Sequence, residues 1–166
     1  MIWFIKLLIV FLVWTFSTYW LHRLAHVKNK YNILHKFHTA HHEVNYFKGG
    51  EKFGIAYLLF YFGDIRVTAD VLLTITLPLI LLTFFYPSQG LVLLVLHYLH
   101  EVFLSERLLD HNPKINGNIT KYFAWGSYHL EHHRNPKTNY SAFITIWDKV
   151  FKTQKFNNNH KEKPKF

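Results

Sequence analysis

The sequence predicts an all-α integral membrane protein with about three transmembrane helices, one interfacial helix and a histidine-rich helical cap on the cytoplasmic side. Three observations support this prediction. The chain of 166 residues contains long apolar runs, eight of its 13 histidines are grouped in three short motifs outside those runs, and its basic residues are concentrated in the segments that carry the motifs. A chain of this length is expected to form one domain.

The first apolar run, Ile2–Leu21, carries only one charged side chain, Lys6. A run of about 20 apolar residues matches the thickness of the hydrocarbon core of a bilayer. A secretory signal is the alternative, but the run has no A-x-A-like cleavage site and leads directly into His22 and Arg23. We therefore expect the first transmembrane helix here.

The second apolar run is Val67–Tyr86, which Asp70 interrupts near one end. The third is Leu91–Leu104, and its helix is expected to continue toward His111. Between these runs, the turn at residues 87–90 is so short that the two helices must form a hairpin.

Two further segments differ from the spans. Phe53–Phe62 is apolar but short, so we expect it to lie in the interface or to re-enter the membrane. Asn157–Phe166 is polar and basic without an apolar period, which predicts a disordered tail. The expected organisation is thus a membrane-embedded domain at residues 1–156 and a tail at residues 157–166.

The distribution of charge predicts an orientation. The formal net charge is +9, which could indicate either nucleic acid or the cytoplasmic face of a membrane as the partner. Arg23–Arg66 contains seven Lys and Arg residues, the stretch after Leu104 contains 11, and the hairpin turn contains none. The positive-inside rule then places the N-terminus and the hairpin tip outside, and the central loop and the C-terminal third inside. We expect no nucleic-acid partner.

Three histidine motifs carry the expected chemistry. Residues at i, i+3 and i+4 share one face of a helix, so each motif should present its imidazoles together. Neutral imidazole binds Fe, Zn, Cu or Ni. The motifs offer eight imidazoles, too many for one ion that keeps a position open for chemistry and about the right number for two. The motif residues are His22 and His26, then His38, His41 and His42, then His129, His132 and His133.

The remaining histidines give weaker signals. His111 is expected at the inner end of the third helix and is added to the expected ligands, whereas His35 could be a ligand or an orienting partner. His97 and His100 could be ligands, could support ligands, or could form hydrogen bonds between helices. His160 in the tail is not expected to matter. At 3.6 residues per turn, one face of the third helix would carry His97, His100, Glu101, Leu104, Leu108 and His111.

Two other interpretations of the motifs fit the sequence less well. A single histidine pair could simply form hydrogen bonds on the surface of a helix, but the H-x2-H-H spacing occurs twice. A metal-storage tract would be contiguous and low in complexity, which these motifs are not. The absence of cysteine excludes thiolate ligands and disulfides. Asp148 is expected to orient a histidine or to cap a turn.

Taken together, the motifs resemble those of the fatty acid hydroxylase and sterol desaturase superfamily. The resemblance extends from about Tyr19 to Thr153, with Thr15, Ser141 and Lys152 as departures from the usual residues. The elements that carry it are Tyr19-Trp20-Leu21-His22-Arg23-Leu24-Ala25-His26, Leu34-His35-Lys36-Phe37-His38-Thr39-Ala40-His41-His42, His111-Asn112, Asn139-Tyr140-Ser141 and Ile146-Trp147-Asp148-Lys149-Val150-Phe151-Lys152-Thr153.

The resemblance implies a non-haem di-iron enzyme that uses O2 to hydroxylate or desaturate a lipid, such as a fatty acyl chain or a sterol. Its cofactors would be two iron ions, with zinc possible in purified protein. Electrons would come from an external cytochrome b5-like or ferredoxin-like protein, because the chain has no motif for flavin, haem or an iron–sulfur cluster.

Three other functions remain as alternatives. The first is a membrane metal-binding or metal-transport protein without redox chemistry, which would place its histidines along a pore rather than on one side. The second is a structural membrane protein with a degenerate site. Within the enzyme class, the third is a carotenoid hydroxylase, although the motifs of that family are not seen around the clusters.

Overall fold

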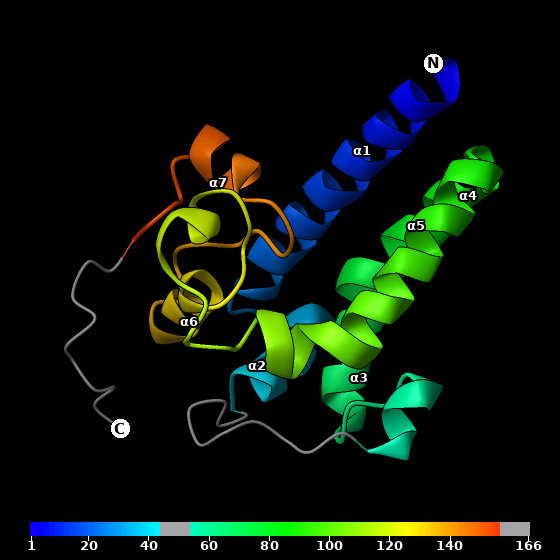
Figure 1. Ribbon diagram of the computed structural model, residues 1–166. Coiled ribbons are helices and arrows are strands. Elements are labelled where there is room, and N and C mark those ends of the chain that lie inside the picture. The colour runs from blue at the N-terminus through cyan, green and yellow to red at the C-terminus, as the bar shows by residue number, and fades with distance from the viewer. Residues whose placement is uncertain (44–53, 157–166) are drawn as a thin grey trace.

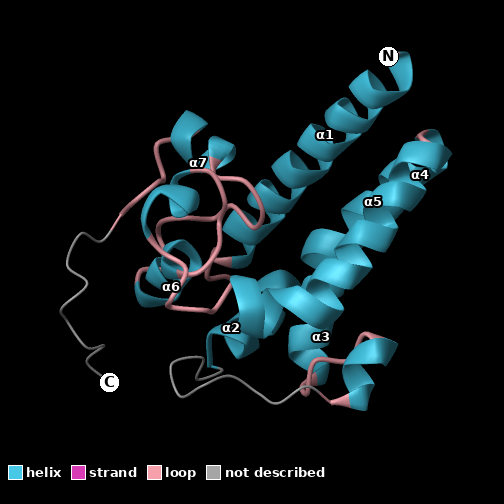
Figure 2. Cartoon of the chain, in the orientation of Figure 1, coloured by secondary structure: helices cyan, strands magenta, loops and turns pink. Residues whose placement is uncertain are grey.

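The computed structural model describes residues 1–43 and 54–156, and this part of the chain is helical apart from loops and one isolated β-bridge between Phe123 and Ile144. Three long helical rods lie side by side, and short helices and loops form a cap at one end of them (Figures 1 and 2). The expected tail at residues 157–166 lies outside the described residues.

The first rod is α1 (Ile2–Ala25), which covers the first expected span. Only 28% of its most apolar 18-residue window is buried. Ile2, Phe4 and Leu8 are exposed along it. Because the core helix of a water-soluble domain would bury such residues, the exposed apolar surface favours a helix in contact with lipid.

The second rod is a continuous helix from Ile65 to Phe85, the other segment long and apolar enough to cross a membrane. It consists of α3 (Ile65–Val71), the π-helical segment η3 (Leu72–Thr76) and α4 (Leu77–Phe85). Pro78 has no N–H to donate to the preceding turn, and the N–H of Leu77 reaches back five residues to Leu72 O. In this widened segment, Ile75 O accepts a hydrogen bond from Trp14 Nε1 of α1 at 2.9 Å, which ties the two rods together.

The third rod forms the expected hairpin with the second. It consists of α5 (Pro87–Leu99) and the π-helix η4 (His100–Leu109). The prediction that residues 87–90 form the loop of the hairpin is wrong. These residues are the first helical turn of α5, and the chain reverses at Tyr86. Gly90 permits the tight reversal, since a Cβ there would lie 2.6 Å from the Cα of Thr83. The third rod does not qualify by length and composition as a membrane-crossing helix, so the three-span topology stays a prediction.

The N-terminus and the hairpin tip lie at the same end of the rods (Figure 1). Trp3 Nε1 donates a hydrogen bond to Ser88 Oγ at 3.1 Å, which joins these two segments directly. An apolar cluster of Val10, Trp14, Leu79 and Leu93 packs the three rods against one another. The histidine motifs therefore lie at the opposite end, where α1 finishes and the cap begins.

The prediction that six residues of the third helix share one face is wrong, because η4 is a π-helix. Its hydrogen bonds span five residues, as from Asp110 N to Ser105 O, so the period of 3.6 residues does not apply. Glu101 and His111 are buried, whereas Leu104 and Leu108 are exposed. The wider turn separates the polar residues from the two leucines.

The cap is built around α2 (Ile33–Glu43), η5 (Gly117–Lys121), α6 (Ser127–Arg134) and α7 (Ile146–Val150). Of the expected interfacial helix, Gly54–Phe62 is described, and only the 3-10 helix η2 (Ile55–Leu59) forms there. Phe60 ends η2 in the left-handed conformation, with φ of 58°.

Candidate metal centre

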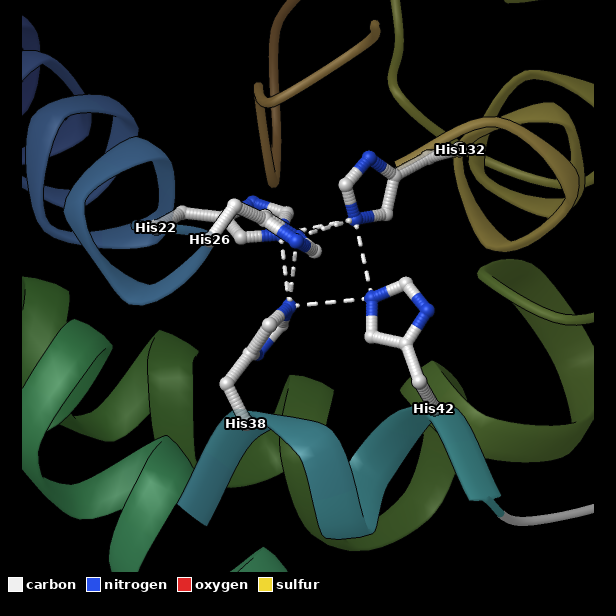
Figure 3. A group of neighbouring side chains, drawn as sticks. All are labelled: His22, His26, His38, His42 and His132. Carbon is white, nitrogen blue, oxygen red and sulfur yellow. Dashed lines mark hydrogen bonds between the residues drawn. The ribbon is translucent and has the colours of Figure 1, made fainter. Parts of the chain in front are cut away.

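Five histidines from three helices converge into one group, which we call group A: His22, His26, His38, His42 and His132 (Figure 3). His22 and His26 come from the end of α1, His38 and His42 from α2, and His132 from α6. Each offers a ring nitrogen within 4.8 Å of all the others. Segments 110 residues apart in the sequence, at His22 and His132, thus meet at one point.

The nitrogens of group A are arranged as the ligands of one ion. His38 Nε2 and His132 Nε2 each lie 2.9–3.1 Å from the Nε2 atoms of His22, His26 and His42. These six contacts match the edges between axial and equatorial corners of a trigonal bipyramid. Such an edge is about 1.4 times the bond length, so it corresponds to metal–nitrogen bonds of about 2.1 Å, the usual length for imidazole. The donor set therefore fits a transition-metal ion.

The outward-facing nitrogens of group A fix the tautomers. Nδ1 of His22 donates to Tyr140 O at 2.6 Å, and Nδ1 of His132 donates to Thr138 O at 2.7 Å. Since carbonyl oxygens only accept, the proton of each neutral ring is on Nδ1 and its Nε2 presents a lone pair inward. Nδ1 of His38 makes the corresponding contact with Asp70 Oδ2, at 2.8 Å. Converging lone pairs repel one another unless a cation lies between them.

A second group, group B, contains His41, His111, His129 and His133. His133 Nε2 lies 3.1 Å from His111 Nε2 and 3.2 Å from His129 Nε2. The two groups are in contact, since the rings of His42 and His133 are 4.4 Å apart between centroids. Four donors leave an ion in group B with more open positions than five leave an ion in group A.

Each H-x2-H-H motif divides its histidines between the groups. In α2, His38 and His42 belong to group A and His41 to group B, whereas in α6 His129 and His133 belong to group B and His132 to group A. Residues four apart lie on one face, and the residue three after the first lies about 80° round the helix from the middle of that pair. The repeated spacing thus places one pair of histidines in one group and the third histidine in the other.

Burial and mutual repulsion keep these imidazoles neutral. Burial, followed by the charges of neighbouring histidines, lowers the pKa of His132 and of His133 well below the usual value. The same causes lower the pKa of His42 to about 2. Neutral imidazole is the form that binds a metal, so the site is ready to do so at neutral pH without first losing protons.

A cavity of about 80 Å³, counted as the space open to the centre of a water molecule, borders both groups. It has room for several waters or for a short stretch of a lipid chain. His41, His111 and His129 of group B form part of its wall, and Phe62, Val67, Val71, Ile75 and Phe143 form an apolar part. An apolar chamber beside a metal-binding group is suited to chemistry on hydrocarbon.

The model of the fatty acid hydroxylase family matches residues 7–153 of the chain. The chain belongs to the fatty acid hydroxylase family. The expected resemblance is thereby confirmed over most of the sequence. Comparison with curated proteins and with solved structures gave no significant match.

In this member of the fatty acid hydroxylase family, the nine main expected ligands are the nine members of groups A and B. Their role as ligands stays a prediction. The three secondary candidates lie outside both groups. His35 Nδ1 contacts Ala25 O at 2.8 Å, His97 Nε2 contacts Thr76 Oγ1 at 2.9 Å, and His100 Nδ1 contacts Glu101 Oε1 at 3.2 Å. The contact of His97 with Thr76 is the hydrogen bond between helices that was one of its expected roles.

Asp148 organises the loop that supports His22. Its fully buried carboxylate accepts hydrogen bonds from the backbone N–H of Tyr140 and of Ser141, both at 2.8 Å, and from Tyr128 Oη at 2.8 Å. Tyr140 O in turn accepts from His22. Asp148 therefore acts on His22 through the backbone of this loop rather than by contact.

Sequence reasoning treated Asp70 only as an interruption of the second span and missed its role. Its carboxylate is buried, as is the His38 ring that it contacts. Burying a carboxylate in an apolar helix is costly unless it has a partner. An isolated acid within an apolar run was therefore the available signal, but it did not reveal which histidine is the partner.

We expect Asp70→Asn to weaken metal binding by roughly 10–100-fold. An asparagine can donate to Nδ1 and so stabilise the tautomer of His38 whose Nε2 carries the proton and cannot bind metal. Affinity is measured by competition with a chelator. Asp64→Asn is the matched control, since Asp64 lies on the same helix and caps its exposed N-terminus, where asparagine serves equally well. Equal affinities for the two variants would contradict the assignment.

Proposed function

We propose that the protein uses O2 to oxidise an unactivated C–H bond of a membrane lipid, such as a fatty acyl chain or a sterol, at two iron ions held by groups A and B. The observation that carries this proposal is the pair of adjoining imidazole groups beside a largely apolar cavity, at the end of helices with exposed apolar surfaces. Family membership suggests the same chemistry, lipid hydroxylation or desaturation.

The residues of this chain have three tasks in such a reaction. When bound, the irons would supply the reduction of O2 and the attack on the C–H bond. The nine histidines hold the ions without adding negative charge, and Asp70, Tyr140 and Thr138 keep three of the rings in the binding tautomer. The apolar wall positions the hydrocarbon and limits the entry of water. Electrons come from an external cytochrome b5-like or ferredoxin-like donor.

The test uses the full chain in lipid nanodiscs, loaded with iron and supplied with a chemical one-electron reductant and 18O2. We expect membrane lipid extracts to yield a product that contains one 18O atom per molecule if the reaction is hydroxylation, or one new double bond if it is desaturation. Comparison of lipids from cells with and without the protein identifies the natural substrate. A protein with both metals bound that moves metal across vesicles but oxidises no lipid would refute the proposal.

We further propose that the N-terminus lies outside and that the histidine groups and the C-terminus lie on the cytoplasmic side. The charge distribution supports this orientation, with seven Lys and Arg residues in Arg23–Arg66 and 11 after Leu104. Reporter fusions at the two ends should give opposite sidedness. Fusions that report both ends on the same side would contradict the three-span topology.

A further inference from the structure

A second polar network lies on η4, outside groups A and B. Glu101 Oε1 is 3.2 Å from His100 Nδ1 and 3.6 Å from His97 Nδ1. On the other side of the same ring, His100 Nε2 is 3.8 Å from Asp110 Oδ1. Ser105 Oγ donates to Asp110 Oδ2 at 2.7 Å. His100 thus stands between two carboxylates, with one ring nitrogen toward each.

The side chains of the network become more buried from Asp110 to Glu101. The side chains of Asp110 and His100 are 14% and 13% exposed, whereas that of Glu101 is 7% exposed. Glu101 and Asp110 both contribute to the wall of the cavity. Burial lowers the pKa of His41 of group B, and the negative charge of Glu101 acts in the opposite direction. The buried end of the network therefore faces the same chamber as group B.

Buried ionisable groups of this kind need an explanation. A carboxylate in an apolar helical setting is costly to bury, and a hydrophobic side chain of similar size would stabilise the fold at least as well. Chains of Glu, His and Asp at such positions are suited to moving protons, because an imidazole can accept a proton on one nitrogen and release one from the other. Neither Glu101 nor His100 belongs to a histidine group, so both are free for this task.

The proposed function has a need that this network can meet. Hydroxylation follows RH + O2 + 2e⁻ + 2H⁺ → ROH + H2O, with the electrons from the external one-electron donor. The O–O bond breaks, one oxygen enters the C–H bond, and the other leaves as water after accepting two protons. The apolar residues of the cavity wall offer no protons, whereas ionisable side chains in another part of the wall, among them Glu101 and Asp110, can transfer them.

We propose that His100 and Glu101 carry protons into the cavity beside group B during the reduction of O2. Neutral His100 accepts a proton at Nε2, on the side that faces Asp110, and releases the proton on Nδ1 to the Glu101 carboxylate, which passes it into the cavity. Rotation of the ring then restores the starting tautomer. The step at 3.2 Å is within reach for direct transfer, and the gap of 3.8 Å needs a small movement or one bridging water. This inference rests on the proposed function, because the reduction of O2 is the reaction that consumes the protons. The distances between the side chains of the network do not depend on that function.

The first test compares Glu101→Gln with the unchanged protein, both loaded with iron in nanodiscs. Glutamine keeps the size and a hydrogen-bonding oxygen but cannot transfer a proton. We expect unchanged metal content, product formation lower by about 100-fold, release of hydrogen peroxide and a larger solvent deuterium isotope effect. Glu101→Asp should restore part of the activity. Gln89→Leu, which removes another buried polar side chain from the same hairpin, should leave the peroxide yield unchanged.

The second test does not depend on lipid oxidation. In zinc-loaded protein, the shared proton should give infrared bands of carboxyl and imidazole that shift between H2O and D2O and are lost in both Glu101→Gln and His100→Gln. O2 consumption with a chemical reductant and no lipid should also slow in Glu101→Gln. Full coupling and an unchanged isotope effect in Glu101→Gln, or the absence of these bands from the unchanged protein, would overturn the proposal. If the infrared bands and the slower O2 consumption are observed but no lipid is oxidised, the proposed function is refuted and the proposed proton transfer is not.

Discussion

Replacing His132 by alanine is expected to remove the ion of group A and to abolish lipid oxidation, a loss of more than about 100-fold. His132 is fully buried, and its Nε2 lies within 3.1 Å of the Nε2 atoms of His22, His26 and His42. Loss of a partner that merely orients a ligand costs roughly 10–100-fold in affinity or activity, and loss of the ligand itself should cost more. The ion would be left with an incomplete set of donors, so the geometry and the redox potential change together.

His132→Ala should still insert into the membrane, because insertion depends on the apolar helices and not on the cap. The measurements are membrane level, bound metal and O2-dependent product. His133→Ala should empty group B instead, while His38→Ala and His41→Ala should disable groups A and B respectively. His160→Ala is the control, since His160 belongs to none of the three sequence motifs. Full metal content and full activity in His132→Ala would rule out the two-metal interpretation.

The purified protein is expected to bind two metal ions per chain, and their removal should lower its melting temperature by on the order of 10 °C or more. An ion that binds only the folded state, and whose free concentration is about 100 times its Kd, stabilises that state by about 2.7 kcal/mol. Two such ions act on a protein whose melting temperature changes by about 2–4 °C per kcal/mol. In addition, the apo form leaves the ring nitrogens of nine imidazoles converging in two groups.

Elemental analysis and thermal unfolding before and after treatment with a chelator test this prediction. Zinc in place of iron would agree with it, because zinc binds imidazole well and ordinarily more tightly than Fe²⁺. Adding back either metal should restore the melting temperature. The alternative is that the histidines merely hold helices together by hydrogen bonds, and it predicts that a chelator changes nothing. One ion or none in well-folded protein would also contradict the prediction.

The amino-acid sequence alone predicts the helical class, both of the segments that could cross a membrane, the hairpin, the family and the nine histidines that form groups A and B. These features depend on short-range information. An apolar run of about 20 residues has few alternatives to a helix that contacts lipid. Histidines three and four residues apart lie close together on a helix whatever the rest of the fold does. The motifs at His38 and His129 could therefore be recognised without knowledge of their partners.

The tertiary structure decides how those motifs combine. The spacing places His41 and His42 next to each other, but only the packing of α2 against α1 and α6 assigns them to different groups. It also identifies Asp70 as the partner of His38, because 32 residues and a turn of the chain separate the two. Contacts between helices depend on how the rods cross, which the periodicity of one helix does not specify.

In the third rod, the periodicity of the sequence fails to predict which side chains are buried even within a single helix. A period of 3.6 residues predicts one face for Glu101, Leu104 and Leu108, but the backbone there adopts hydrogen bonds over five residues. That choice changes which side chains turn inward, so Glu101 faces the cavity while the leucines face outward. The sequence determined which residues could carry the chemistry, and the three-dimensional packing decided which of them meet, because a buried polar group takes its position from partners distant in the chain.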